Sequence, residues 1–110
     1  MAKADRLARL DERRIEAEAE YRAALVAALE VTAAGRWGLF GHNQDKISRE
    51  AAAPTVAALC ELGEEIDDMR DRLGLESFEL HAEFIASRGR VGSHAVGEPK
   101  QAQQWLARLT

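Results

Sequence analysis

The sequence predicts an all-α fold, an irregular small helical bundle with a long N-terminal helix and three to four shorter helices. Leu, Ala, Glu and Arg, all good helix formers, dominate its 110 residues. Val, Ile, Thr and Tyr are sparse, and no long alternating apolar run indicates a strand. Apolar side chains instead recur with helical spacing in several segments. A chain of this length forms one domain, and we assign residues 1–110 to it.

The first helix is expected from Ala4 to Ala34 and would be about 46 Å long at roughly 1.5 Å per residue. Its first half has few apolar anchors: Leu7, Leu10 and Ile15. Its second half carries a regular stripe: Tyr21, Leu25, Ala28, Leu29 and Thr32. We therefore expect the second half to pack in the core. The plainer interpretation of residues 1–20 is a solvated, partly frayed end, and the sharper one is a projecting or dimerising arm.

The stretch from Gly35 to Asp45 should end this helix and begin the rest of the domain. Gly35 suits the left-handed position that commonly follows a helix. The plainer interpretation is a tight connection whose Trp37 and Phe40 plug the bundle. The alternative is a partner-binding surface, because Trp and Arg often anchor interfaces. That surface would be formed by Arg36, Trp37, Phe40, His42 and Asn43.

Pro54 interrupts the next helical pattern. Proline inside a helix costs about 3 kcal/mol, so we predict a short helix from Lys46 to Ala53 and a new helix that opens at Pro54 and runs to Leu73. One kinked helix from residue 46 is the alternative. The second part has an apolar seam with alternating spacings of three and four residues: Leu59, Leu62, Ile66, Met69 and Leu73. Gly63 borders this seam and would let a neighbouring helix come close.

Two shorter helices complete the predicted bundle. The first spans Phe78 to Ser87, with Phe78, Ala82 and Ile85 on one stripe and His81 and Phe84 flanking it. A glycine-rich loop follows, and Pro99 opens the last helix at a favoured position. That helix has a narrow apolar stripe: Ala102, Trp105, Leu106 and Leu109.

The charge pattern excludes some partners. The net charge is −4, with −7 in residues 45–84 and +3 in residues 86–110. Backbone binding of nucleic acid needs clustered Lys and Arg, so we expect no nucleic-acid partner. We expect no membrane association either, because no leader is visible and the longest weakly polar run is too short to span a bilayer. The single Cys60 cannot form an internal disulfide, so a cytoplasmic location is the default expectation.

An acidic ridge is the main candidate for chemistry. Its like charges lie at helical neighbour spacing, and Glu61, Glu64, Glu65 and Asp68 could hold Mg²⁺ or Mn²⁺. The run Glu64-Glu65-Ile66-Asp67-Asp68 resembles the first acidic motif of the all-α nucleoside-triphosphate pyrophosphohydrolases of the MazG type. In that family, two more acids on the following helix complete the metal site. Here Glu76 and Glu79 have the spacing, but they lie at a helix start. The alternative is a solvated face that basic side chains counter.

The leading functional hypothesis is a non-enzymatic protein–protein interaction module without a cofactor, which pairs with itself as a homodimer or with another protein. The poorly apolar start of the first helix and the regular apolar seam favour it. The alternative is a metal-dependent phosphohydrolase that uses Mg²⁺ on the acidic ridge. The histidines His42, His81 and His94 fit no short metal-binding spacing, and we expect His81 to be a partly buried structural ring.

Overall fold

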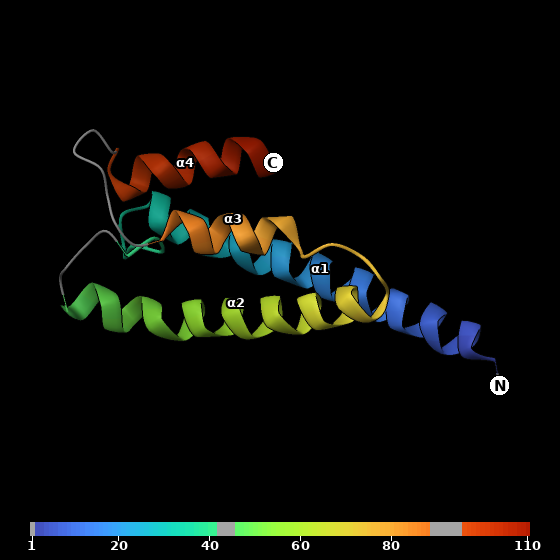
Figure 1. The fold of residues 1–110 in the computed structure, drawn as a ribbon. Coiled ribbons are helices and arrows are strands. Elements are labelled where there is room, and N and C mark those ends of the chain that lie inside the picture. Colours follow the sequence, from blue (N-terminus) through green and yellow to red (C-terminus); the bar gives the residue numbers. More distant parts are fainter. Residues whose placement is uncertain (1, 42–45, 89–95) are drawn as a thin grey trace.

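The computed structural model describes residues 2–41, 46–88 and 96–110. This part of the chain contains four α-helices and no strand, which confirms the predicted all-α class. The helices are α1 (Lys3–Ala33), α2 (Lys46–Arg72), α3 (Glu79–Ser87) and α4 (Glu98–Leu109). Successive helices run in opposite directions, as Figure 1 shows. None of the described helices combines the length and the apolar character that a bilayer crossing requires.

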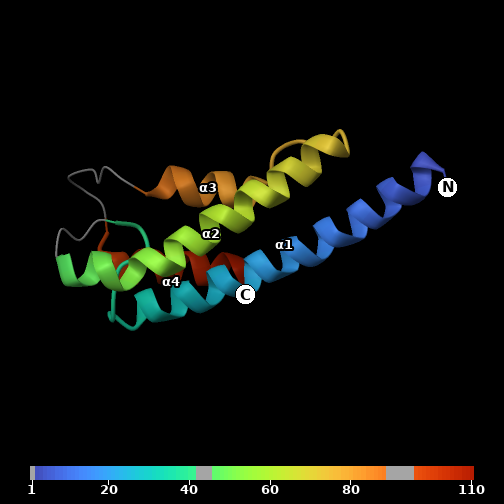
Figure 2. The same ribbon diagram turned by 90° about the horizontal axis from the view of Figure 1, so that it is seen from below.

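The helices surround one core. α1 packs against α2 and α4, and α3 faces α1 from the opposite side of the bundle (Figures 1 and 2). The buried apolar side chains form one cluster: Tyr21, Leu25, Ala28, Leu29, Leu39, Phe40, Ala52, Val56, Leu59, Ile66, Phe84, Ala102 and Trp105. The N-terminal turns of α1 extend past the end of α2, beyond the other helices (Figure 1). The molecule is therefore elongated, with extents of 54 × 24 × 23 Å.

α1 follows the sequence prediction closely. All five residues of its predicted stripe are buried, from Tyr21 to Thr32. Gly35 has a φ of +77°, and its N–H and that of Arg36 donate to the carbonyl oxygens of Thr32 and Val31. This pair of bonds satisfies the last carbonyls of the helix, as in other glycine-terminated helices.

α2 differs from the prediction, because it continues through Pro54 as one helix. The predicted break before Pro54 is wrong, and the alternative of one helix from residue 46 is correct. The Pro54 ring is exposed, while Ala52 and Val56 on either side are buried. Packing of these neighbours offsets the lost hydrogen bond, since tertiary burial often overrides local propensity.

The buried line of α2 shares Leu59 and Ile66 with the predicted seam but differs from it at the other positions. It consists of Ala52, Val56, Leu59, Gly63 and Ile66. Leu62 and Met69 are only partly buried. Gly63 lies within this line rather than beside it, because the His81 ring of α3 occupies the space over it.

α3 is rotated relative to its predicted stripe. His81 and Phe84 point into the core, whereas Ile85 is 44% exposed. The helix begins at Glu79, and the Phe78 N–H just before it donates to Asp67 Oδ1 of α2 over 2.7 Å. α3 therefore takes its cap from another helix and not from a residue of its own segment.

α4 confirms the last predicted helix. Pro99 lies in its first turn, as expected. Ala102 and Trp105 are buried, and Leu106 and Leu109 are partly buried against the core.

Candidate functional site

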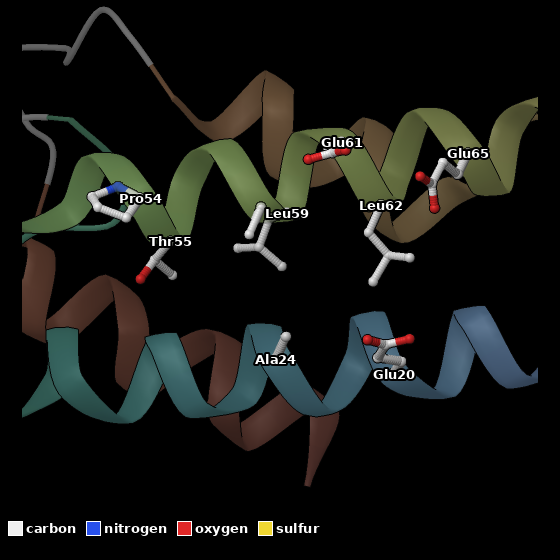
Figure 3. Close-up of a pocket in the computed structure, with 9 residues that line it drawn as sticks. Glu20, Ala24, Pro54, Thr55, Leu59, Glu61, Leu62 and Glu65 are labelled. Atoms are coloured by element: carbon white, nitrogen blue, oxygen red, sulfur yellow. The ribbon is translucent and has the colours of Figure 1, made fainter.

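An open groove of about 460 Å³ runs between α1 and α2. Figure 3 shows the side chains that line it. α1 contributes Glu20 and Ala24, and α2 contributes a longer series: Pro54, Thr55, Ala58, Leu59, Glu61, Leu62 and Glu65. The lining of α2 follows from helical spacing, because residues three and four apart share one face of a helix.

The floor of the groove is apolar, and small side chains create it. Ala24 of α1 and Ala58 of α2 are too short to fill the space between the helices. Leu59 is buried beneath the groove, whereas Leu62 is only partly buried and points across the gap toward α1 (Figure 3). The result is a shallow apolar strip that the rest of the bundle leaves uncovered.

Carboxylates dominate the charge of the groove. Glu20, Glu61 and Glu65 are exposed, and Glu20 and Glu65 lie on opposite sides of Leu62 in Figure 3. None of the nine lining residues, all within the described part of the chain, is basic. These three carboxylates also form no ion pair with another described residue. The groove therefore presents an apolar floor with an uncompensated acidic rim.

An ion-pair network connects α1 and α2 beyond Glu65. Arg70 Nη1 of α2 lies 2.9 Å from Glu18 Oε2 of α1, and Arg14 Nη1 lies 2.7 Å from the same oxygen. Arg70 Nε also donates to the Glu76 carbonyl oxygen over 2.5 Å, and its guanidinium lies 5.9 Å from the Phe78 ring centre. The two helices are thus fixed to each other at the side of the bundle from which the first turns of α1 project.

The predicted metal ligands divide between two environments. Glu61 and Glu65 line the groove, whereas Glu64 and Asp68 do not. Asp68 instead forms an ion pair with Arg72 of the same helix, at 3.2 Å. Across residues 2–41, 46–88 and 96–110, no three His, Cys, Asp or Glu side chains converge to hold a metal ion.

The predicted partner-binding residues lie in the connection that joins α1 to α2, and only some of them are exposed. Arg36 is exposed and Trp37 is half-buried. Phe40 is fully buried and packs on Trp105 with ring centres 5.8 Å apart, so its assignment to a surface is wrong and its role as a plug is correct. His42 and Asn43 lie outside the described residues.

Three polar contacts hold this connection in place, which explains why Phe40 points inward. The Leu39 N–H donates to Thr32 Oγ1 over 3.2 Å, and the Phe40 N–H donates to Glu98 Oε1 over 2.7 Å. Arg88 Nε donates to the Leu39 carbonyl oxygen over 3.1 Å. Leu39 is fully buried and is thus a further plugging side chain that the sequence did not reveal, while Trp37 packs against the core and is partly buried.

A second polar centre lies inside the core. Tyr21 Oη and His81 Nδ1 share a hydrogen bond of 2.8 Å between α1 and α3. Tyr21 is inaccessible to solvent and His81 is 7% exposed. Burial raises the pKa of the Tyr21 phenol well above its ordinary value of 10, with smaller contributions from Cys60 and Asp67. The pair satisfies two buried polar groups, so we interpret it as a structural contact, as the sequence predicted for His81.

The groove was not predicted as a site from the sequence. The acidic side chains were recognisable, but the pattern indicated no role for Ala24 or Ala58, and it placed Leu62 on an apolar seam for pairing helices. The combination of glutamates and alanines on one helix face was the available signal. No protein-family model, curated protein or solved structure matches this chain.

Proposed function

We propose that this protein is a non-enzymatic protein–protein interaction module that binds a partner helix in the groove between α1 and α2. The observation that supports this function is the apolar floor with its unpaired acidic rim. An amphipathic helix laid in an apolar groove is a recurring mode of recognition. The groove runs about 16 Å along α2 from Pro54 to Glu65, at 1.5 Å per residue, which matches three turns of a partner helix.

The chemistry of the groove defines the partner. Its apolar floor suits a helix with aliphatic side chains on one face, at positions three and four residues apart. Its acidic rim suits Lys or Arg beside those positions. Exposed ion pairs contribute only about 0.2–1 kcal/mol each, so the floor supplies most of the affinity. The rim supplies orientation, selectivity and a faster association that salt reduces.

The placement of the acidic residues favours binding over the metal-dependent phosphohydrolase. Mg²⁺ needs several oxygen ligands that converge on one point. Glu61 and Glu65 face the groove, but Asp68 is engaged with Arg72. The acidic face therefore suits a row of separate basic side chains better than it suits one ion.

A charge-reversal experiment tests the proposed function. The probe is a fluorescein-labelled amphipathic helix built from leucine and lysine, and its binding is followed by fluorescence anisotropy. The groove variant carries Glu61→Lys and Glu65→Lys. Its matched control carries Glu64→Lys and Asp68→Lys, which make the same charge change on the same helix outside the groove.

We expect the groove variant to bind the probe about tenfold more weakly, since two reversed pairs change the binding free energy by about 1.4 kcal/mol. The control should change affinity less than threefold. Equal losses in both variants would show that only net charge matters, and they would refute the groove as the binding site.

A metal titration tests the alternative function. Thermal melts with and without millimolar Mg²⁺ or Mn²⁺ should coincide if the acidic face binds basic side chains. A rise in melting temperature that Glu65→Gln and Asp68→Asn abolish would support the metal-dependent hydrolase instead. Phosphate release from a nucleotide panel would then identify the reaction.

A further inference from the structure

We infer that the helix that occupies the groove is the N-terminal part of α1 from a second copy of this chain. The inference rests on the proposed function and names its partner. We call residues 3–13 the arm. In the inferred dimer, the two α1 helices run antiparallel, and each arm lies in the groove of the other copy.

The arm is long and uncovered within one chain. Tyr21 is the first buried residue of α1, and the first turns of the helix extend past the end of α2 (Figures 1 and 2). Leu7 is 37% exposed, and Ile15 just after the arm is 54% exposed. A helix of this length is marginal in water without tertiary contacts, so a covering partner would stabilise it.

The arm has the charge that the groove lacks. Arg6, Arg9 and Arg13 are spaced three and four residues apart, so they share one face of α1. All three are exposed, and none forms an ion pair with another described residue. Their positive charges complement the acidic rim.

The same face of α1 carries the two groove residues of this helix, Glu20 and Ala24. They continue the spacing of Arg6, Arg9 and Arg13, and Ala17 lies between the two groups. One line along α1 therefore carries three arginines in its first half and Glu20 in its second half, where Glu61 and Glu65 of α2 complete the acidic rim. A helix with this pattern is complementary to an antiparallel copy of itself.

A two-fold axis near Ala17 brings the basic half of each α1 beside the groove of the other copy. It places Arg13 of one copy beside Glu20 of the other and Leu10 opposite Ala24. The small side chains of Ala17 and Ala24 permit a close approach of the two helices. The arm is about 15 Å long at 1.5 Å per residue, close to the length of the groove. The contact is isologous, so it closes as a dimer and does not extend into a fibre.

Two opposite charge variants test the pairing. The first carries Arg9→Glu and Arg13→Glu, and has an acidic arm and an acidic groove. The second carries Glu61→Lys and Glu65→Lys, and has a basic arm and a basic groove. Sedimentation equilibrium of each full-length chain, and of an equimolar mixture, measures the dimer dissociation constant. Arg36→Glu, on an exposed residue just beyond α1, is the control.

We expect the unmodified chain and the control to dimerise at tens of micromolar. Each variant alone should dimerise at least tenfold more weakly, and the mixture should form a heterodimer because both of its arm–groove contacts are complementary. An unmodified chain that stays monomeric, or a mixture that stays monomeric, would overturn the inference. So would dimerisation that neither variant weakens.

Cross-linking provides a second readout. In a Cys60→Ser background, Ala17→Cys places two thiols beside the inferred axis, where a disulfide can form. Ala23→Cys places them about 18 Å apart along the helices at 1.5 Å per residue, so it is the matched control. Oxidation should link only the first variant. Equal linking of both would contradict the antiparallel register.

The labelled peptide separates this inference from the proposed function. If the arm fills the groove, the Arg9→Glu and Arg13→Glu variant should bind the peptide more tightly than the unmodified chain, since its groove is free. A monomeric unmodified chain that binds the peptide would overturn the arm inference alone. Absence of peptide binding to that variant would overturn the proposed function as well.

Discussion

Replacing Gly63 with alanine should push the His81 ring out of its place in the core. A Cβ at Gly63 would lie 2.4 Å from His81 Cγ and Nδ1, far inside van der Waals contact. His81 cannot swing aside freely, because it is 7% exposed and bonded to Tyr21 Oη. One added methyl group therefore disturbs the contact between α2 and α3 and the hydrogen bond between α1 and α3.

The expected effect has three parts. Alanine is better than glycine in a helix by about 1 kcal/mol, which favours the variant. Overpacking of a filled core costs about 2 kcal/mol. Loss of the bond to the buried Tyr21 hydroxyl costs about 2 kcal/mol more. Gly63→Ala should therefore lower the free energy of unfolding by about 3 kcal/mol, a fall in melting temperature of about 12 °C for a chain of this size.

Urea unfolding followed by circular dichroism measures this loss, and a second background isolates its cause. In His81→Ala, the ring is absent, so Gly63→Ala should stabilise the protein by about 1 kcal/mol through helix propensity alone. The two substitutions should thus be coupled by several kcal/mol. If Gly63→Ala stabilises the protein in both backgrounds, the packing of His81 over Gly63 is refuted.

Substitutions at three further positions probe other contacts. Tyr21 is buried in its neutral form with a pKa raised above 10, so the free energy of unfolding should be unaffected below pH 10 and fall by about 1.4 kcal/mol per pH unit above it. Tyr21→Phe should lose about 1 kcal/mol at pH 7 but lack this decline, as urea unfolding at pH 9 and pH 11 would show. Glu98→Ala removes the acceptor of the Phe40 N–H and should cost about 2 kcal/mol in a thermal melt, whereas Glu98→Gln, which keeps an oxygen there, should cost less. Pro54→Ala restores a helical donor in α2 and should raise stability by up to about 3 kcal/mol, and a lower melting temperature would contradict our account of this proline.

The buried face and the end of α1 could be predicted from local sequence signals, whereas those of α2 could be predicted only in part. The stripe from Tyr21 to Thr32 and the stop at Gly35 depend on residues within a few turns of each other. The buried line of α2 depends on Gly63, whose role exists only because His81 arrives from a distant segment. The continuity of α2 through Pro54 likewise follows from burial of its neighbours, which a local cost cannot reveal.

The groove could not be predicted from the sequence alone, because it depends on how α1 and α2 are placed relative to each other. Glu61 and Glu65 were identifiable as an acidic pair one turn apart. That Ala24 and Glu20 face them follows only from the register between α1 and α2. Asp68 shares the helix face of Glu61 and Glu65, but it lies about one turn further along α2, beyond the groove, and it pairs with Arg72.

Arg70 has a consequence for the order in which the chain assembles. Its guanidinium meets Glu18 of α1 and two groups of the connection between α2 and α3, the carbonyl group of Glu76 and the ring of Phe78. These contacts are complete only when all of those segments are docked. We predict that they form after the folding barrier, so that Arg70→Ala accelerates unfolding in stopped-flow measurements and leaves the folding rate nearly constant. Arg70 would then govern how long the native state lasts rather than how fast it is reached.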